Sequence, residues 1–327
     1  MRRFFLLVIL AALAGAAYLL LAPAGPTHET FVDFPPGTSV RQMGALLEEH
    51  GIIRSRYAFQ VVRLAERGTL KAGEYRFDHP ATVLEVYDRL RRGDVFTRSV
   101  TIPEGANMFD VAERLEAAQL GPKELFLQAA NRDVQLVADL DPDAPTLEGY
   151  LFPDTYHLPR KATPDQIAAA MVKRFRAAAA SMGLTRNFHQ VVTLASIVEK
   201  ETPLESERPL VASVMVNRLE KRMPLMTDPS VIYAQLREGR YRGTIYQSDL
   251  AYDSPYNTYR HAGLPPGPIA NPGVASLKAA MSPAATNYLY FVAASGDPSG
   301  HSRFAATLEE HTQNVQAYRK TLHNGSR

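Results

Sequence analysis

The chain has 327 residues, 46% of them hydrophobic and 21% charged, and a formal net charge of +2. This balance is typical of a globular protein with room for two domains, and it excludes a disordered or fibrous one. Lys and Arg are scattered, so nucleic acid is not predicted as a partner. The absence of cysteine excludes disulfides, thiolate nucleophiles, cysteine-ligated metals and a lipidated cysteine.

The chain begins with an apolar segment, residues 4–22, which follows Arg2 and Arg3. At about 1.5 Å rise per residue it is long enough to cross a hydrocarbon core of about 30 Å. The next cationic side chain is Arg41, so the positive-inside rule predicts a single-pass transmembrane helix with residues 1–3 in the cytoplasm. The alternative is a cleaved signal peptide, because Ala22-Pro23-Ala24 has the form of a cleavage site. Both interpretations place the body of the protein outside the cytoplasm.

After a linker over residues 23–30, residues 31–98 are predicted to form a small α+β subdomain. The pattern of apolar side chains, caps and breakers predicts these elements in order: a strand Phe31–Phe34, a helix capped by Ser39 and ending near Gly51, a helix from Ser55 to Ala65, a strand Gly73–Phe77, a helix Thr82–Arg92 and a strand Arg98–Ile102. The order strand, helix, helix, strand resembles a LysM-like module, a fold that binds N-acetylglucosamine chains. A generic α+β adaptor is the alternative.

Residues 99–320 are predicted to form a mainly helical α+β domain, followed by a C-terminal tail over 321–327. Candidate helices are Met108–Ala118, Pro122–Ala130, Pro164–Ser181, Asn187–Glu201, Glu205–Lys221, Pro229–Glu238 and Gly273–Met281, with a strand at Tyr288–Ala293. The long irregular stretch from 239 to 272 indicates a functional surface, because structureless segments of that length are uncommon in compact domains.

The helix predicted over residues 187–201 points to a candidate acid. Asn187 and Gln190 are a plausible capping pair. At about 100° per residue, Glu201 falls only about 20° from Leu194, on the apolar face, whereas Glu199 falls on the outer side. Pro203 should end the helix near Glu201.

A carboxyl group at that position is expected to have a raised pKa. It sits at the negative end of the helix dipole and beside apolar side chains, and both effects disfavour the ionised form of Glu201. A raised pKa is what a general acid needs near neutral pH. The alternative is an ordinary solvated carboxylate at a frayed helix end.

Other kinds of catalytic site are not indicated. The nine histidines are dispersed without ligand spacing, so neither a metal nor another cofactor is predicted. The sequence has no Gly-x-Ser-x-Gly elbow and no phosphate-binding glycine loop after a strand.

Seven motifs occur in one order along the chain, and together they resemble the YceG-like family of endolytic murein transglycosylases. They are Glu148-Gly-Tyr-Leu-Phe-Pro-Asp-Thr-Tyr156, Leu194-Ala-Ser-Ile-Val-Glu-Lys-Glu201, Val216-Asn-Arg-Leu219, Thr227-Asp-Pro229, Tyr256-Asn-Thr-Tyr259, Gly263-Leu-Pro-Pro-Gly-Pro-Ile-Ala-Asn-Pro-Gly273 and Tyr288-Leu-Tyr-Phe-Val292. The resemblance spans roughly residues 30–320.

The resemblance implies a peptidoglycan lytic transglycosylase of the bacterial inner membrane, with a LysM-like subdomain, a periplasmic catalytic domain and Glu201 as its acid/base. It would cut the bond between N-acetylmuramic acid and N-acetylglucosamine within nascent glycan strands, leave 1,6-anhydro ends and so terminate elongation. Contact with peptidoglycan synthases is expected from this family role.

Polar and aromatic residues of the motifs are the candidates for substrate binding: Tyr256, Asn257, Tyr259, Asn217, Asp228 and Glu148. For each, a structural role is the alternative, and Asp228 is expected to cap the helix that follows it. The proline-rich stretch over residues 264–272 is expected to shape a cleft wall. A hydrolytic muramidase would need a second carboxylate to activate water, and a non-catalytic peptidoglycan-binding scaffold is the rival from another class.

Overall fold

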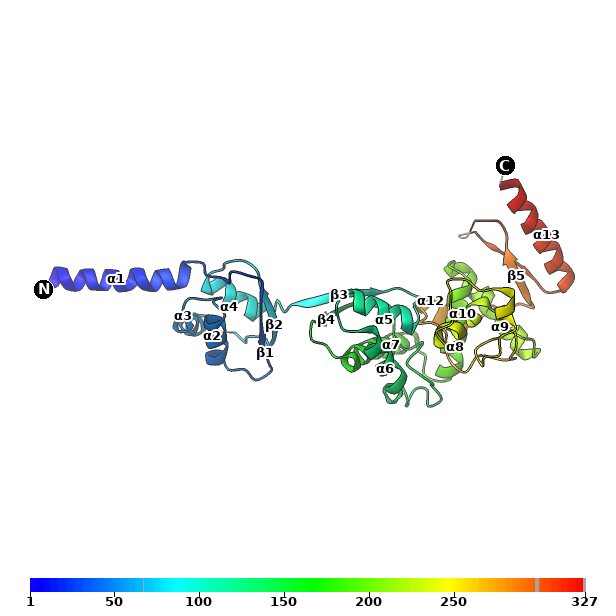
Figure 1. Ribbon diagram of the computed structural model, residues 1–327, viewed down its shortest axis with the longest axis horizontal. Helices are drawn as coiled ribbons and strands as arrows, with labels where there is room; N and C mark the ends of the chain where they lie inside the picture. The colour runs from blue at the N-terminus through cyan, green and yellow to red at the C-terminus, as the bar shows by residue number, and fades with distance from the viewer. Residues whose placement is uncertain (67, 298–299, 326–327) are drawn as a thin grey trace. The chain divides into compact units, whose positions relative to one another are not determined.

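Figure 1 shows the computed structural model, which describes residues 1–66, 68–297 and 300–325. The chain divides into two compact units, Met1–Arg98 and Ser99–Arg327, each with its own hydrophobic core. Both units contain helices and paired strands. The predicted mixture of helix and sheet is therefore confirmed.

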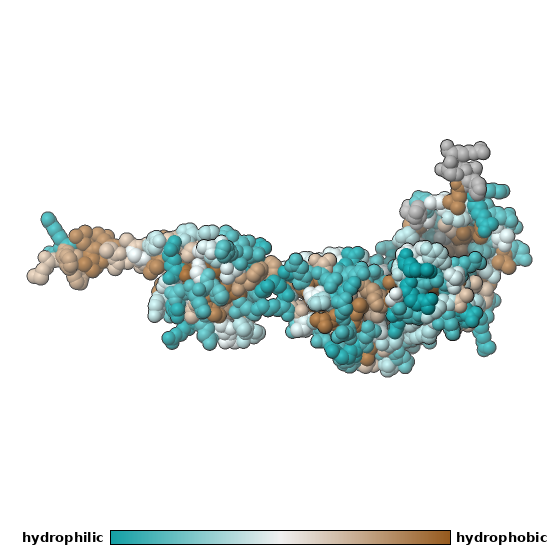
Figure 2. Space-filling model, viewed as in Figure 1, coloured by the Kyte–Doolittle hydropathy of each residue, from teal (hydrophilic) through white to brown (hydrophobic). Residues whose placement is uncertain are grey.

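The first helix, α1 (Arg2–Leu21), has no buried side chain. Figure 2 shows the apolar surface of α1 in brown, on the left of the view. By length and composition α1 can cross a membrane, as predicted, although an N-terminal signal sequence would meet the same criteria.

The segment after α1 is tied to the rest of unit 1. Ala24 and Ala81 form an antiparallel bridge with N–O distances of 2.9 and 2.8 Å. Arg54 donates a 2.9 Å hydrogen bond to the carbonyl of Pro23, and its guanidinium lies 5.0 Å from the centre of the Tyr18 ring. The first residues of the expected linker are therefore held against the unit.

The described residues of unit 1 beyond α1 form two antiparallel strands and three helices. Strand β1 (Thr30–Phe34) pairs with β2 (Gly73–Phe77), with Thr30 opposite Phe77. Between the strands lie α2 (Val40–Glu49) and α3 (Arg56–Ala65), and α4 (Val83–Arg92) follows. The predicted cap at Ser39 is confirmed, and Ser55 and Thr82 likewise accept backbone hydrogen bonds at the starts of α3 and α4.

Unit 2 begins with β3 (Thr97–Ile102), which pairs with β4 (Asp154–Pro159). Between these strands in the sequence lie α5 (Met108–Ala117), α6 (Lys123–Arg132) and a 3-10 turn at Val134–Leu136. Helix α7 (Pro164–Met182) follows β4. Strand β4 was not predicted. Tyr156 and Leu158 face the core and are separated by an exposed residue. This alternation along the sequence is the signal that could have revealed the strand.

The rest of unit 2 carries the candidate site. It comprises α8 (Phe188–Glu201), a 3-10 turn (Glu205–Glu207), α9 (Arg208–Glu220), α10 (Asp228–Arg237), α11 (Gln247–Leu250), α12 (Val274–Met281), β5 (Tyr290–Ala293), β6 (Ser302–Ala305) and α13 (Leu308–Gly325). Strand β6 and helix α13 were not predicted, and α13 extends into the expected C-terminal tail.

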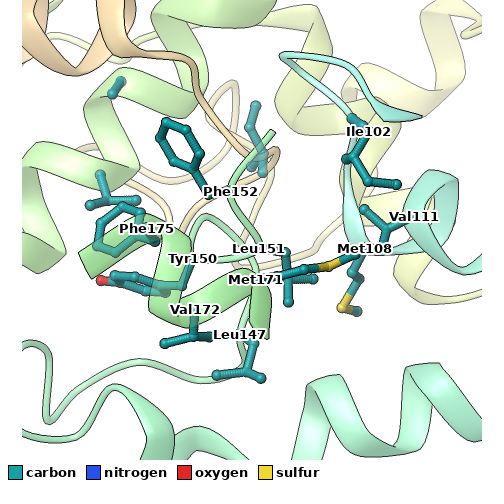
Figure 3. Packing of buried hydrophobic residues seen from close by; sticks show 14 of the residues in the cluster. Ile102, Met108, Val111, Leu147, Tyr150, Leu151, Phe152, Met171, Val172 and Phe175 are labelled. Carbon is teal, nitrogen blue, oxygen red and sulfur yellow. The ribbon is translucent and has the colours of Figure 1, made fainter. Parts of the chain in front are cut away.

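The first of the seven motifs lies in the core of unit 2. Figure 3 shows Leu147, Tyr150 and Leu151 among the buried side chains, with the Tyr150 ring beside Phe175. The two rings meet edge to face, with centroids 5.0 Å apart, and the Tyr150 hydroxyl donates a 2.5 Å hydrogen bond to Asp141. This part of the motif therefore builds the framework behind the site.

Candidate active site

Glu201 is the last residue of α8. Thr202, which precedes Pro203, has extended backbone angles (φ −143°, ψ 132°), so the helix ends where it was predicted to end. The start differs from the prediction. Asn187 is left-handed (φ 56°) and its side chain makes no capping hydrogen bond, so the predicted capping pair of Asn187 and Gln190 is wrong.

The Glu201 side chain is half-buried. Burial raises its pKa to about 7; the negative charge of Asp228 adds to the rise, and the positive charge of Arg218 opposes it. The expected rise in pKa is therefore confirmed, with burial as its main cause. A carboxyl group with this pKa can both donate and accept a proton near neutral pH.

Asp228 is the second carboxylate near Glu201. It is the first residue of α10, and Thr227, not Asp228, occupies the cap position, so the predicted capping role is wrong. The Tyr259 hydroxyl donates a 2.6 Å hydrogen bond to its Oδ1. Burial and this contact with Asp228 raise the pKa of Tyr259, which keeps the phenol protonated as a donor. Thr258 links the motif that contains Tyr259 to the start of α10, because its hydroxyl accepts a 2.9 Å hydrogen bond from the Thr227 amide.

Arg218, on α9, supplies positive charge beside Glu201. Its guanidinium donates to the carbonyls of Leu289 and Leu225 at 2.7 and 2.8 Å, and it lies 5.4 Å from the centre of the Tyr290 ring. Burial lowers its pKa, although an arginine stays charged at any physiological pH. Sequence reasoning quoted the motif that contains Arg218 but did not single the residue out.

Glu199 was predicted to face solvent, and this is wrong. Its side chain is 5% exposed and accepts a 2.9 Å hydrogen bond from Arg208, whose side chain is 6% exposed. The amide of Gly273 donates to its other oxygen at 3.0 Å. Glu104 approaches Arg208 at 3.6 Å, and burial followed by the charge of Glu199 raises the pKa of Glu104. The outer side of α8 is therefore covered by residues that come from distant parts of the chain.

Tyr256 and Asn257 do not present their side chains to solvent. Asn257 is fully buried and donates to the carbonyls of Leu250 and Tyr252. Tyr256 is buried, and its hydroxyl accepts a 3.0 Å hydrogen bond from Arg237. Both residues support the 239–272 segment from within, so their prediction as substrate-binding residues is corrected.

Glu148 and Asn217 also make structural hydrogen bonds. Glu148 is buried and accepts hydrogen bonds from the Met108 amide at 2.8 Å and the Asn271 side chain at 2.9 Å. Burial raises its pKa to about 8. Asn217 donates to two backbone carbonyls, at Thr286 and Tyr288. Glu148, which was predicted to line the groove, is therefore buried instead, and the role of Asn217 in substrate binding stays a prediction.

The proline-rich segment is fixed to the first two motifs by side-chain hydrogen bonds. Asn271 accepts from the amide of Leu151 at 2.9 Å and donates to the carbonyl of Ala106 at 2.8 Å. The amide of Ile269 donates to the hydroxyl of Ser196 on α8 at 3.0 Å. Three of the motifs therefore interlock around α8 and fix the helix that carries Glu201.

A cavity of about 820 Å³ opens along the first half of α8. Its wall includes Leu264, Pro265 and Pro266, together with side chains of α8, α9 and α12. The proline-rich segment therefore forms part of the wall of this cavity. Glu201 is not among the lining residues. In the part of the chain that the structure describes, no group of three or more His, Asp or Glu side chains could hold a metal ion.

The structure is that of a two-unit α+β protein in which a carboxyl group with a raised pKa lies near a second carboxylate and an arginine. The model of the YceG-like family matches residues 32–317, so the chain belongs to this family.

Similar proteins agree with this assignment. An endolytic murein transglycosylase of Bacillus subtilis (strain 168) is 33% identical, over 93% of this chain and 90% of the relative. Another, from Streptococcus pneumoniae (strain D39), is 29% identical over 94% of this chain and 63% of its own length. A crystal structure of a yceG-like protein from Listeria monocytogenes superposes with a TM-score of 0.57 at 32% identity, covering 88% of this chain and 99% of that one.

Proposed function

We propose that this protein is a membrane-anchored endolytic murein transglycosylase in which Glu201 is the general acid and base. The observation that carries the proposal is the half-buried Glu201 at the end of α8, with a pKa of about 7, between Asp228 and Arg218. The names of the relatives supply the substrate class, peptidoglycan glycan strands.

In the first step the protonated Glu201 donates its proton to the glycosidic oxygen as the bond from C1 of N-acetylmuramic acid to that oxygen breaks. The carbonyl oxygen of the muramic N-acetyl group stabilises the electron-poor C1, which is why one protein carboxyl group suffices in substrate-assisted cleavage. Arg218 stabilises the Glu201 carboxylate that this step creates.

In the second step the Glu201 carboxylate accepts the proton of the C6 hydroxyl while O6 attacks C1. The product is a 1,6-anhydro end, no water is consumed, and Glu201 regains its proton. Asp228 favours that protonated form, so the neighbouring charges support both halves of the cycle.

A hydrolytic muramidase is the second candidate, and Asp228 is the observation in its favour. It is a second carboxylate near Glu201, as activation of water would require. Its Oδ1 is occupied by the Tyr259 hydroxyl, which supports an electrostatic role instead. A non-catalytic scaffold that binds peptidoglycan is the third candidate.

We propose that α1 anchors the protein in the inner membrane, with its N-terminus cytoplasmic and residues 31–320 on the periplasmic side. Residues 31–98 form the LysM-like subdomain that grips the glycan, and residues 99–320 form the catalytic domain. The strand order of unit 1 and the apolar α1 support this arrangement. Contact with peptidoglycan synthases would follow from a role in ending strand growth.

The test is digestion of purified sacculi by the full chain in detergent, with the products resolved by mass. Wild type is compared with Glu201→Gln and with Glu205→Gln, a matched control that removes an exposed carboxylate four residues away. We expect internal fragments with anhydro ends from wild type and Glu205→Gln, and a loss of about 10²–10⁴ in rate for Glu201→Gln with binding to sacculi retained.

Other outcomes separate the candidates. Reducing ends, one water heavier, would assign the hydrolase. Binding without cleavage by all three proteins would support the scaffold, and full activity of Glu201→Gln would remove Glu201 from the mechanism.

A further inference from the structure

Helix α3 has apolar side chains on two opposite faces. One face packs into the core of unit 1 through three buried residues, Ala58, Phe59 and Val62. The other face is exposed and carries three large apolar residues, Tyr57, Val61 and Leu64, which are 72%, 54% and 81% exposed. We call these three the α3 stripe.

The α3 stripe is a continuous row. Its members are spaced four and three residues apart, so they fall within about 60° of one another around the helix axis. Single exposed apolar residues are common on soluble proteins and need no explanation. A helix that is apolar on both faces indicates that each face meets apolar surroundings. Among the described residues of unit 1 beyond α1, five large apolar side chains are exposed, and three of them form the α3 stripe.

The α3 stripe lies close to the end of α1. Helix α1 contacts α3, and Leu20, near its end, packs against the core of unit 1. Arg54, just before α3, connects this part of unit 1 to the end of α1 through its contacts with Tyr18 and Pro23. Figure 1 shows α3 on the side of unit 1 from which α1 leaves. A membrane crossed by α1 would therefore have its surface at the level of α3.

We propose that Tyr57, Val61 and Leu64 insert into the leaflet from which α1 emerges, so that α3 lies in the membrane surface. This inference rests on the anchoring role proposed above for α1. The partner is the lipid bilayer, because an amphipathic face in the interface buries its apolar side chains about 5–10 Å deep. Tyrosine is enriched at that level, and Arg63 on α3 has a long stem that can carry its charge to the phosphates.

The sequence offers a clean test because it contains neither tryptophan nor cysteine. Single tryptophans are introduced into the full chain at Leu64 or Tyr57 on the α3 stripe, at Leu13 inside α1, and at Arg41, an exposed residue at the start of α2. Each variant is reconstituted into phosphatidylcholine and phosphatidylglycerol vesicles without brominated lipid or with lipid brominated near the top of the acyl chain, and Leu13→Trp is also measured with lipid brominated near the end of the acyl chain. We expect blue-shifted emission and severalfold greater quenching by brominated lipid for Leu64→Trp and Tyr57→Trp than for Arg41→Trp.

The variants test the anchoring by α1 and the insertion of the α3 stripe separately. If Leu13→Trp is quenched but Leu64→Trp and Tyr57→Trp behave like Arg41→Trp, α1 is in the membrane and the insertion of the α3 stripe is overturned. If Leu13→Trp itself escapes quenching, the anchor fails and the insertion fails with it. Emission at the stripe that shifts only when another protein is added would assign the stripe to a protein partner and would also overturn the proposal.

Discussion

The hydroxyl of Tyr259 donates a 2.6 Å hydrogen bond to Asp228, and the two residues are 31 positions apart in the sequence. This contact fixes the side chain of Asp228 at the start of α10. The negative charge of Asp228 raises the pKa of Glu201, the proposed acid.

The first prediction concerns the pH dependence of cleavage. Asp228→Asn keeps an acceptor for Tyr259 but removes the charge that raises the pKa of Glu201, so that pKa should fall below about 7. The acid form is lost as pH rises through this pKa, so the alkaline limb of kcat/KM should move to lower pH. Each unit of movement costs about tenfold in rate on that limb. Asp253→Asn, which changes an exposed carboxylate in the 239–272 segment, should leave the limb in place. An upward or absent movement for Asp228→Asn contradicts the role given to its charge.

The second prediction concerns stability and Glu148. Burial raises its pKa from 4.5 to about 8, so the unfolded chain releases this proton at lower pH than the folded one. The stability that comes from the neutral form is complete below about pH 4.5 and is lost as pH rises toward 8. Relative to Glu148→Gln, the wild-type free energy of unfolding should fall by up to about 1.4 kcal/mol per pH unit in this window. Urea unfolding followed by circular dichroism at several pH values measures the difference, and parallel curves for the two proteins would refute it.

The third prediction concerns the buried ion pair of Glu199 and Arg208. Removing one partner leaves the other charge buried, so Glu199→Ala should cost about 3–5 kcal/mol of unfolding free energy. Asp154→Asn breaks the pair with Arg174, whose side chains are 38% and 45% exposed, and should cost about 1 kcal/mol or less. Equal effects in urea unfolding would mean that the Glu199 pair is solvated.

The fourth prediction concerns close packing at Gly149. Its φ is +87°, and a Cβ there would lie 2.5 Å from Pro268 and 2.8 Å from Val192. Gly121 has a φ of +119° but nothing within 4 Å of such an atom. Both changes to alanine strain the backbone, but Gly149→Ala also overpacks the contact between the first motif and the proline-rich segment. It should destabilise by about 1–3 kcal/mol more than Gly121→Ala. Thermal unfolding of both variants measures the difference in stability. Equal losses of stability would show that the contact between Gly149 and Pro268 relaxes to accept the added methyl group.

The sequence predicted what local pattern determines. The period of apolar residues placed α8 and put Glu201 on its apolar face, and Pro203 marked its end. Unit 1 was predicted element by element for the same reason, because capping residues and breakers separate its short helices and strands.

Local pattern could not predict which tertiary contacts the polar side chains make. Glu199 lies on the outer side of α8 by its angle, yet Arg208 and the Gly273 amide cover that side. Asn257 has the polar character of a sugar-binding residue, but two backbone carbonyls close to it in sequence take both hydrogens of its amide. Arg218 belongs to the motif Val216-Asn-Arg-Leu219, but only the fold brings its charge near Glu201.

The last helix has a practical meaning for anyone who shortens this protein. His311, on α13, stacks on Tyr290 with ring centroids 5.1 Å apart, and the guanidinium of Arg218 also lies near the Tyr290 ring. A truncation that ends at Thr307 keeps all seven motifs but removes the ring that stacks on Tyr290. The far end of the chain thus belongs to the support of the acid, and a truncated enzyme that lost activity would not by itself reveal a second binding partner.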